Sequence, residues 1–142
     1  MIGLIQRVTQ AAVHVDGVEK ARIGAGMVVL VGVLPADTAE DADSLLTRML
    51  QYRIFADASD RMNLSLTDTQ GDLLLVPQFT LAADTRKGLR PGFAGAAPPE
   101  QGKRLFEHLA AVALQRHGRV QTGVFGANMQ LSLTNDDPAT FW

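Results

Sequence analysis

Two short segments carry the side chains whose types and spacing could do chemistry. The first, Pro77–Leu81, follows an apolar run and leads into a long polar stretch, and strand ends that run into loops are common places for functional sites. Gln78 and Thr80 offer an amide and a hydroxyl group, and the backbone N–H groups of Phe79 and Thr80 could stabilise a substrate oxyanion. We therefore predict Gln78, Phe79 and Thr80 as catalytic groups, against the plainer alternative of a strand end with a capping threonine.

The second segment, Thr134–Thr140, is polar and turn-like and contains an Asp-Pro step at Asp137–Pro138. An X-Pro bond has only a small preference for trans, and a cis proline is usually a retained structural feature. The segment is therefore either a specialised element near a site or an ordinary turn before a last strand.

Most standard catalytic signatures are absent. The chain has no Gly-x-Ser-x-Gly elbow, no His-Glu-x-x-His and no phosphate-binding Gly-x-x-x-x-Gly-Lys. It has no cysteine, which excludes disulfides, thiolate metal sites and cysteine nucleophiles. Its three histidines, His14, His108 and His117, are scattered. We therefore expect no metal site and no cofactor.

The charge balance limits the partners. Thirteen Lys and Arg against fifteen Asp and Glu give a net charge of −2, which is too balanced for a protein that coats nucleic acid by charge. A local basic patch remains possible at Arg86, Lys87 and Arg90, inside an irregular stretch over 82–97. No apolar run reaches the ~20 residues of a membrane span, and the first residues do not resemble a signal peptide. We expect a cytoplasmic protein with no membrane partner.

The elements that must position these segments follow from local patterns. Asp16-Gly17 between alternating segments predicts a hairpin of strands over 2–15 and 18–23. An Asp37 N-cap with Glu40 three residues later predicts a helix to about Gln51. A second helix is expected from Pro98-Pro99 to a cap at Gly118. Further strands are expected over 27–34, 52–55, 62–66, 73–76 and 129–134.

This order of elements predicts a single α+β domain over residues 1–142 with a mostly antiparallel sheet. Antiparallel sheets need helices on only one face, so the two helices are expected on one face, and the other face is free to meet a partner chain.

Taken together, the two segments favour a functional site over an ordinary strand end and an ordinary turn. Residues 78–85 (QFTLAADT) and 134–142 (TNDDPATFW) resemble the two signatures of the D-aminoacyl-tRNA deacylase family. Matching pieces occur in the same order along the whole chain, at residues 5–8, 52–55, 62–64, 90–93, 121–123 and 129–130. No piece is decisive alone, but their order over one short chain is specific.

The resemblance implies a homodimer of barrel-like protomers with active sites at the dimer interface. It implies hydrolysis of the ester between a D-amino acid and the 3′-terminal adenosine of tRNA, with glycyl-tRNA also accepted. A Gly-cis-Pro dipeptide, matching Asp137–Pro138, enters the partner's pocket and excludes an L side chain. Positions expected to support the site are Arg7, Asn135 and Thr140, with Met129 at the adenosine and Arg86, Lys87 and Arg90 at the tRNA backbone.

Two departures from the family pattern affect the site. Pro77 stands where serine is common, and Asp137 stands where the family has glycine, which places a carboxylate beside the chiral pocket. The mechanism also has two versions: backbone donors acting with the tRNA 2′-OH, or Thr80 as nucleophile. Asp137 leaves open an alternative function, a catalytically weakened homologue that binds aminoacyl-tRNA ends or acts as a dimeric interaction module.

Overall fold

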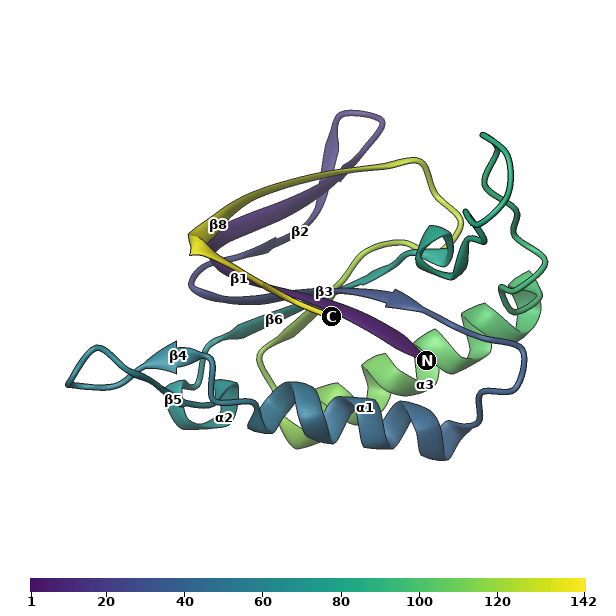
Figure 1. The fold of residues 1–142 in the computed structure, drawn as a ribbon. Coiled ribbons are helices and arrows are strands. Elements are labelled where there is room, and N and C mark those ends of the chain that lie inside the picture. The colour runs from purple at the N-terminus through teal and green to yellow at the C-terminus, as the bar shows by residue number, and fades with distance from the viewer.

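The computed structural model describes residues 1–142 as one mixed sheet that curls over itself above two helices (Figure 1). The main sheet has the order β2-β1-β3-β6-β7, and β8 pairs with β1. Its strands are β1 (Ile2–Val15), β2 (Val18–Ile23), β3 (Gly26–Gly32), β6 (Asp72–Pro77), β7 (Val120–Thr122) and β8 (Met129–Phe141). β4 (Phe55–Ala56) and β5 (Met62–Leu64) form a separate small ribbon.

The long strand β1 makes the barrel-like shape possible. β3 pairs with its residues 2–8 and β2 with its residues 11–15, while β8 pairs along residues 5–15. All three of these pairings are antiparallel, whereas β3–β6 and β6–β7 are parallel. The expected α+β fold with mainly antiparallel pairing is confirmed, and the parallel pairs are an addition that no local pattern indicated.

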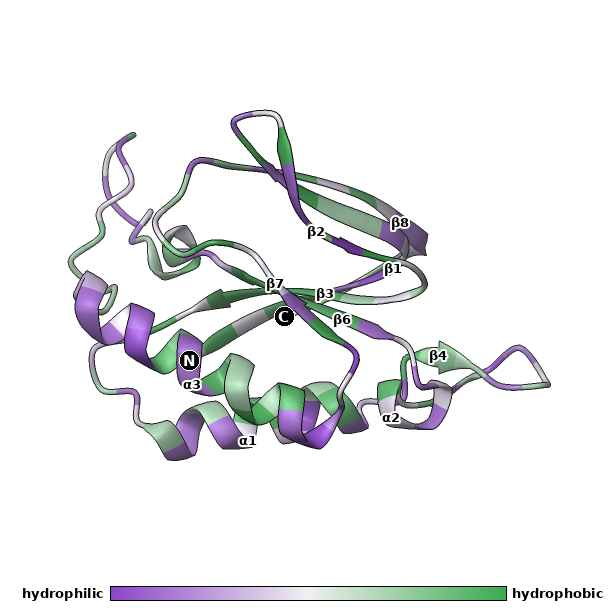
Figure 2. Cartoon of the chain, turned by 180° about the vertical axis from the view of Figure 1, so that it is seen from behind, coloured by the Kyte–Doolittle hydropathy of each residue, from purple (hydrophilic) through white to green (hydrophobic).

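Two helices, α1 (Ala39–Gln51) and α3 (Pro99–Arg116), lie side by side on one face of the sheet (Figure 1), as expected. Between these helices and the sheet lies a core that includes Leu46, Met49 and Leu109, none of which is exposed. A second core lies where β1, β2 and β8 curl over β3 and β6. The strands β3 and β6 between the two cores are strongly apolar (Figure 2).

The hairpin of β1 and β2 turns through Asp16 and Gly17, both at positive φ, as the Asp-Gly pair predicts. The first helix begins one residue later than expected: Thr38 is the N-cap and forms a capping box with Asp41. Asp37 instead accepts hydrogen bonds from the Met1 ammonium and the Leu34 N–H, each at 2.7 Å.

The expected strand over 52–55 is wrong except at Phe55, because the chain leaves α1 at Tyr52 and pairs only from β4 onward. Leu66, expected in a strand, begins α2 (Leu66–Thr69), since Ser65 and Asp68 form a capping box. A one-turn 3₁₀ helix, η1 (Phe79–Ala82), follows β6. No helix in the structure is both long enough and apolar enough to cross a membrane.

Candidate active site

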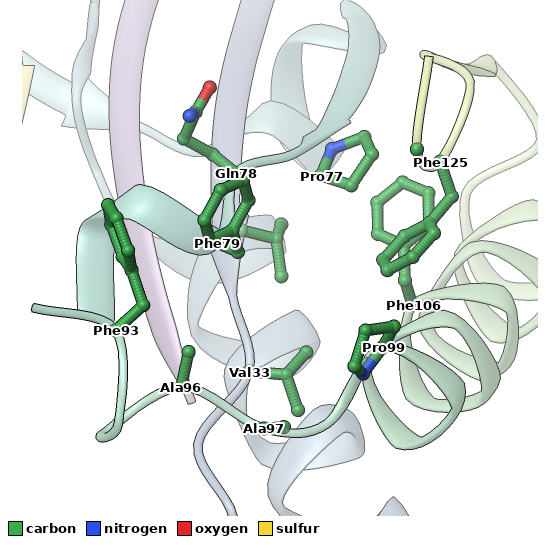
Figure 3. A pocket seen from close by; sticks show the side chains of 13 residues that line it. Val33, Pro77, Gln78, Phe79, Phe93, Ala96, Ala97, Pro99, Phe106 and Phe125 are labelled. Carbon is green, nitrogen blue, oxygen red and sulfur yellow. The ribbon is translucent and has the colours of Figure 1, made fainter. Parts of the chain in front are cut away.

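An apolar pocket opens where the parallel strands β3 and β6 end (Figure 3), and carboxyl ends of parallel strands are common ligand sites. It has a volume of about 400 Å³. Four phenylalanines contribute to its walls: Phe79, Phe93, Phe106 and Phe125. Gln78 is the only polar side chain among the thirteen lining residues. The pocket therefore suits a flat, largely apolar group with one polar edge.

Backbone hydrogen bonds fix the pocket walls to the end of β3. The Gln78 N–H donates to the Val31 carbonyl at 2.7 Å, which places the signature segment beside that strand. The Ala97 N–H donates to the Val33 carbonyl at 2.9 Å and holds the opposite wall. Because both walls are tied to the central sheet, the pocket is formed before a ligand enters.

The start of η1 supplies free backbone donors at the edge of the pocket. The Leu81 N–H reaches the Gln78 carbonyl at 3.3 Å, but the N–H groups of Phe79 and Thr80 find no backbone acceptor, as is usual for the first N–H groups of a helix. The Thr80 hydroxyl accepts a hydrogen bond from Gln78 Nε2 at 2.5 Å. Gln78 and Phe79 thus line the pocket and Thr80 follows them in η1, and their catalytic roles stay a prediction.

No general base lies beside Thr80 among the histidines. His108 is hydrogen-bonded to Asp43 at 2.8 Å between α3 and α1, and its side chain is partly buried. His117 contacts the Gly71 carbonyl at 2.6 Å. No group of three or more His, Asp or Glu side chains converges in a way that could hold a metal ion.

Arg7 is buried in β1, only 7% exposed, and holds the second signature segment. Its Nη1 donates to the Ile54 carbonyl at 2.6 Å, and its Nη2 donates to the Asp136 carbonyl at 3.0 Å. Its Nε makes no hydrogen bond and lies 3.6 Å from the Asp136 carboxylate. The Asp137 carboxylate lies 3.8 Å from Nη2. The guanidinium therefore joins the segment to the chain after α1.

Gln6 pairs with Thr140 and Val8 pairs with Asn135, so between these pairs one residue of β1 lies opposite four residues of β8. These four, residues 136–139, therefore bulge out of the ladder. Asn135 closes the base of this bulge: its Nδ2 donates to the Thr140 hydroxyl, and its Oδ1 accepts from the Ala139 N–H, both at 2.7 Å. The bulge is thus held at both ends by the side chains that the motif contains.

The Asp137–Pro138 bond is trans, as is every peptide bond in the chain, so the expected cis isomer is wrong for this structure. An X-Pro bond prefers the trans isomer by about 0.5–1 kcal/mol, and Pro138 is exposed in the protomer. The chain turns instead through Asp137, whose φ is 81°. This is the backbone region that glycine adopts most easily.

Met129, expected at the adenosine, does not line the pocket. Its sulfur accepts from the Val124 N–H at 3.3 Å and supports the loop that carries Phe125. Phe125 itself was missed by the sequence analysis, although the glycines on its two sides in Gly123-Val124-Phe125-Gly126 indicate a tight loop. Arg86, Lys87 and Arg90 all lie exposed on the loop that precedes Phe93.

Comparison with solved structures identifies the fold first. The fold matches a structure described as a probable eukaryotic D-amino acid tRNA deacylase, with a TM-score of 0.84 at 21% identity, over 98% of this chain and 97% of that one. It matches a c-Myc DNA Unwinding Element Binding Protein with a TM-score of 0.93 at 34% identity, over 98% of this chain and 95% of that one. The chain therefore has the same fold as these two proteins.

The family model described as D-Tyr-tRNA(Tyr) deacylase matches residues 4–142. A D-aminoacyl-tRNA deacylase of Nitrosococcus oceani is 60% identical over 99% of this chain and 91% of its own length. One from Thioalkalivibrio sulfidiphilus is 57% identical over the whole chain and 95% of its own length. The chain belongs to the D-Tyr-tRNA(Tyr) deacylase family and is an enzyme of that class.

Proposed function

We propose that the protein hydrolyses the ester between a D-amino acid, or glycine, and the 3′-terminal adenosine of tRNA in the cytoplasm. The observation that carries this proposal is the pocket lined by Gln78 and Phe79, beside which the N–H groups of Phe79 and Thr80 have no backbone acceptor, in a chain that matches the deacylase family over residues 4–142. The apolar walls suit the terminal adenosine, and the polar edge suits the aminoacyl ester.

The chemistry needs little from the side chains because an aminoacyl ester is already reactive. Water attacks the ester carbonyl carbon, and the two N–H groups stabilise the oxyanion that forms. The C–O bond to the ribose then breaks, the ribose oxygen takes a proton, and the free amino acid leaves. The neighbouring 2′-OH can help orient the attacking water, so the RNA supplies part of the catalyst.

Chiral selection is the part of the proposal that needs two protomers. No residue of the bulge over 136–139 lines the pocket of its own protomer, and both Asp137 and Pro138 are exposed. In a homodimer, the Asp137–Pro138 dipeptide of one protomer would reach the pocket of its partner. Its carbonyls would hold the substrate ammonium there, and its position would leave no room for an L side chain.

We expect the wild-type protein to release D-Tyr from D-Tyr-tRNA and glycine from glycyl-tRNA, and to leave L-Tyr-tRNA intact. Initial rates with the three substrates measure this. Binding of all three without turnover would instead favour the weakened homologue that Asp137 leaves open. Sedimentation of the same preparation at micromolar concentration tests the dimer, and an active species of 15.3 kDa, the mass of one chain, would contradict it.

Thr80→Ala is expected to keep activity within about tenfold of the wild type. The substitution removes a hydroxyl that only accepts from Gln78, whereas the backbone N–H at this position survives. Loss of a true oxyanion donor costs roughly 10²–10³ in rate. A single-turnover assay checks the prediction, with Ser44→Ala, which removes an exposed hydroxyl on α1, as the matched control. A fall of 10² or more in folded Thr80→Ala would favour Thr80 as nucleophile.

A further inference from the structure

The loop between η1 and α3 places three cations next to the pocket. Arg86, Lys87 and Arg90 lie within residues 84–92 and are all exposed. Phe93, which follows the loop, lines the pocket and packs edge-on against Phe79, with ring centroids 5.1 Å apart. The loop is thus joined directly to the wall of the pocket.

The base of this loop is fixed by the protein itself. Asp84 and Gly92 exchange both backbone N–H···O bonds, at 2.7 and 2.9 Å. The Asp84 carboxylate also accepts from Arg86 three times: from its backbone N–H at 3.0 Å, its Nε at 2.9 Å and its Nη2 at 2.8 Å. Gly88, at a φ of 66°, turns the tip. These contacts shape the loop in the absence of any ligand.

The charges of Asp84 and Arg86 cancel each other. The side-chain and backbone hydrogen bonds from Arg86 lower the pKa of Asp84, and the bond to Asp84 raises the pKa of Arg86, so both groups stay ionised. Lys87 and Arg90 form no ion pair within the protomer. They are therefore the two cations of the loop that remain available to an anionic ligand.

A second hollow, of about 620 Å³, lies along the loop. Small residues make up most of its lining: Ala82, Ala83, Gly92, Ala94 and Gly95. Their lack of bulk lets an extended chain come close to the protein backbone. The pocket and this hollow share no lining residue, but neighbouring residues of the segments over 79–82 and 92–96 line one or the other. A strand that ends in the pocket can therefore continue along these segments into the hollow.

We propose that residues 84–92 form a pre-shaped phosphate-binding loop for the single-stranded 3′ end of the tRNA, just before its terminal adenosine. Lys87 and Arg90 contact the phosphates, while Asp84 keeps Arg86 as an internal partner that positions the loop. This proposal rests on the proposed function, since it takes the terminal adenosine to lie in the pocket. Of the three side chains expected at the tRNA backbone, the proposal keeps Lys87 and Arg90 and removes Arg86.

The salt dependence of RNA binding tests the proposal, by fluorescence anisotropy with a labelled short single-stranded RNA that ends in CCA and with uncharged tRNA. Lys87→Gln/Arg90→Gln should lower the slope of log K against log salt by about 1.4, because each single-strand phosphate contact contributes about 0.7. Asp84→Asn/Arg86→Gln removes one charge of each sign, and the backbone pair between residues 84 and 92 still closes the loop. The slope should therefore stay unchanged, while the affinity should fall because the contacts that position the loop are lost. Lys20→Gln, on β2, should also leave the slope unchanged.

Three outcomes would overturn the assignment. An unchanged slope in Lys87→Gln/Arg90→Gln would show that neither cation meets a phosphate. A loss of about 0.7 in Asp84→Asn/Arg86→Gln would show that Arg86 leaves Asp84 for the RNA. A loss confined to whole tRNA would place the loop on the duplex stem instead of the single strand. The proposed function fails separately, if the wild-type protein does not release D-Tyr, whatever these slopes show.

Discussion

Arg7→Met is expected to lower the deacylation rate on D-Tyr-tRNA by about 10², since a misplacement of about 1 Å in a positioning element can cost that much. Arg7 is the side chain that ties the bulge to the rest of the protomer, through the carbonyls of Ile54 and Asp136. Methionine keeps the apolar stem but donates to neither carbonyl. The free energy of unfolding should also fall by about 2 kcal/mol, because the buried Ile54 carbonyl loses its partner.

Two further variants separate position from charge. Arg7→Lys keeps a cation near Asp136 but cannot donate to both carbonyls at once, so most of the loss should remain. Arg61→Met removes an exposed arginine whose side chain makes no hydrogen bond and should change neither rate nor stability. The measurements are single-turnover rates and urea unfolding. A wild-type rate in folded Arg7→Met would show that the bulge needs no support from Arg7.

Elements with strong local signals were predicted from the sequence. The Asp16-Gly17 turn and the two helices follow from dipeptide, capping and proline patterns that act within a few residues. The parallel pairing of β3 with β6 and of β6 with β7 could not be predicted in this way. Strand order depends on contacts between distant segments, which alternation along one strand does not encode.

In the candidate site, too, the residues that are adjacent in the chain could be predicted from the sequence, and those brought in by the fold could not. Gln78, Phe79 and Thr80 are adjacent in the chain, and the structure keeps them adjacent at the start of η1. Phe125 reaches the pocket from a loop that is remote in sequence, so only the fold reveals it. Neutralisation of Arg86 by Asp84 depends on side-chain direction, and a count of basic residues overstates the charge that the loop offers.

Asp137→Gly is the second change with a large expected effect, a rise in the deacylation rate on D-Tyr-tRNA of up to about tenfold, or ~1.4 kcal/mol of barrier. Asp137 has a φ of 81°, which costs a residue with a Cβ about 1 kcal/mol and costs glycine nothing. Its side chain is 85% exposed at the tip of the bulge. In the proposed dimer, that tip enters the partner's pocket, so the Cβ and the carboxylate crowd the substrate.

The free energy of unfolding of Asp137→Gly should differ little from that of the wild type. Glycine relieves the strain at φ 81°, but it adds freedom to the unfolded chain and removes an exposed contact of 3.8 Å with Arg7, which is worth ~0–1 kcal/mol. Urea unfolding of Asp137→Gly should therefore agree with the wild type to within about 1 kcal/mol. A change in rate then reports on the pocket instead of on the fold.

Asp137→Asn and Asp136→Gly identify the cause of the rise. Asparagine keeps the Cβ and tolerates positive φ, so a rate near that of Asp137→Gly would assign the effect to charge, and a rate near the wild type would assign it to bulk. Asp136→Gly makes the same deletion one residue earlier, where φ is not positive, and should not raise the rate.

Rejection of L-Tyr-tRNA should persist in every variant, because backbone carbonyls hold the substrate ammonium. Equal D-Tyr rates in Asp137→Gly and the wild type would show that the aspartate lies clear of the substrate, and rapid L-Tyr release by the wild type would show that this bulge does not select chirality.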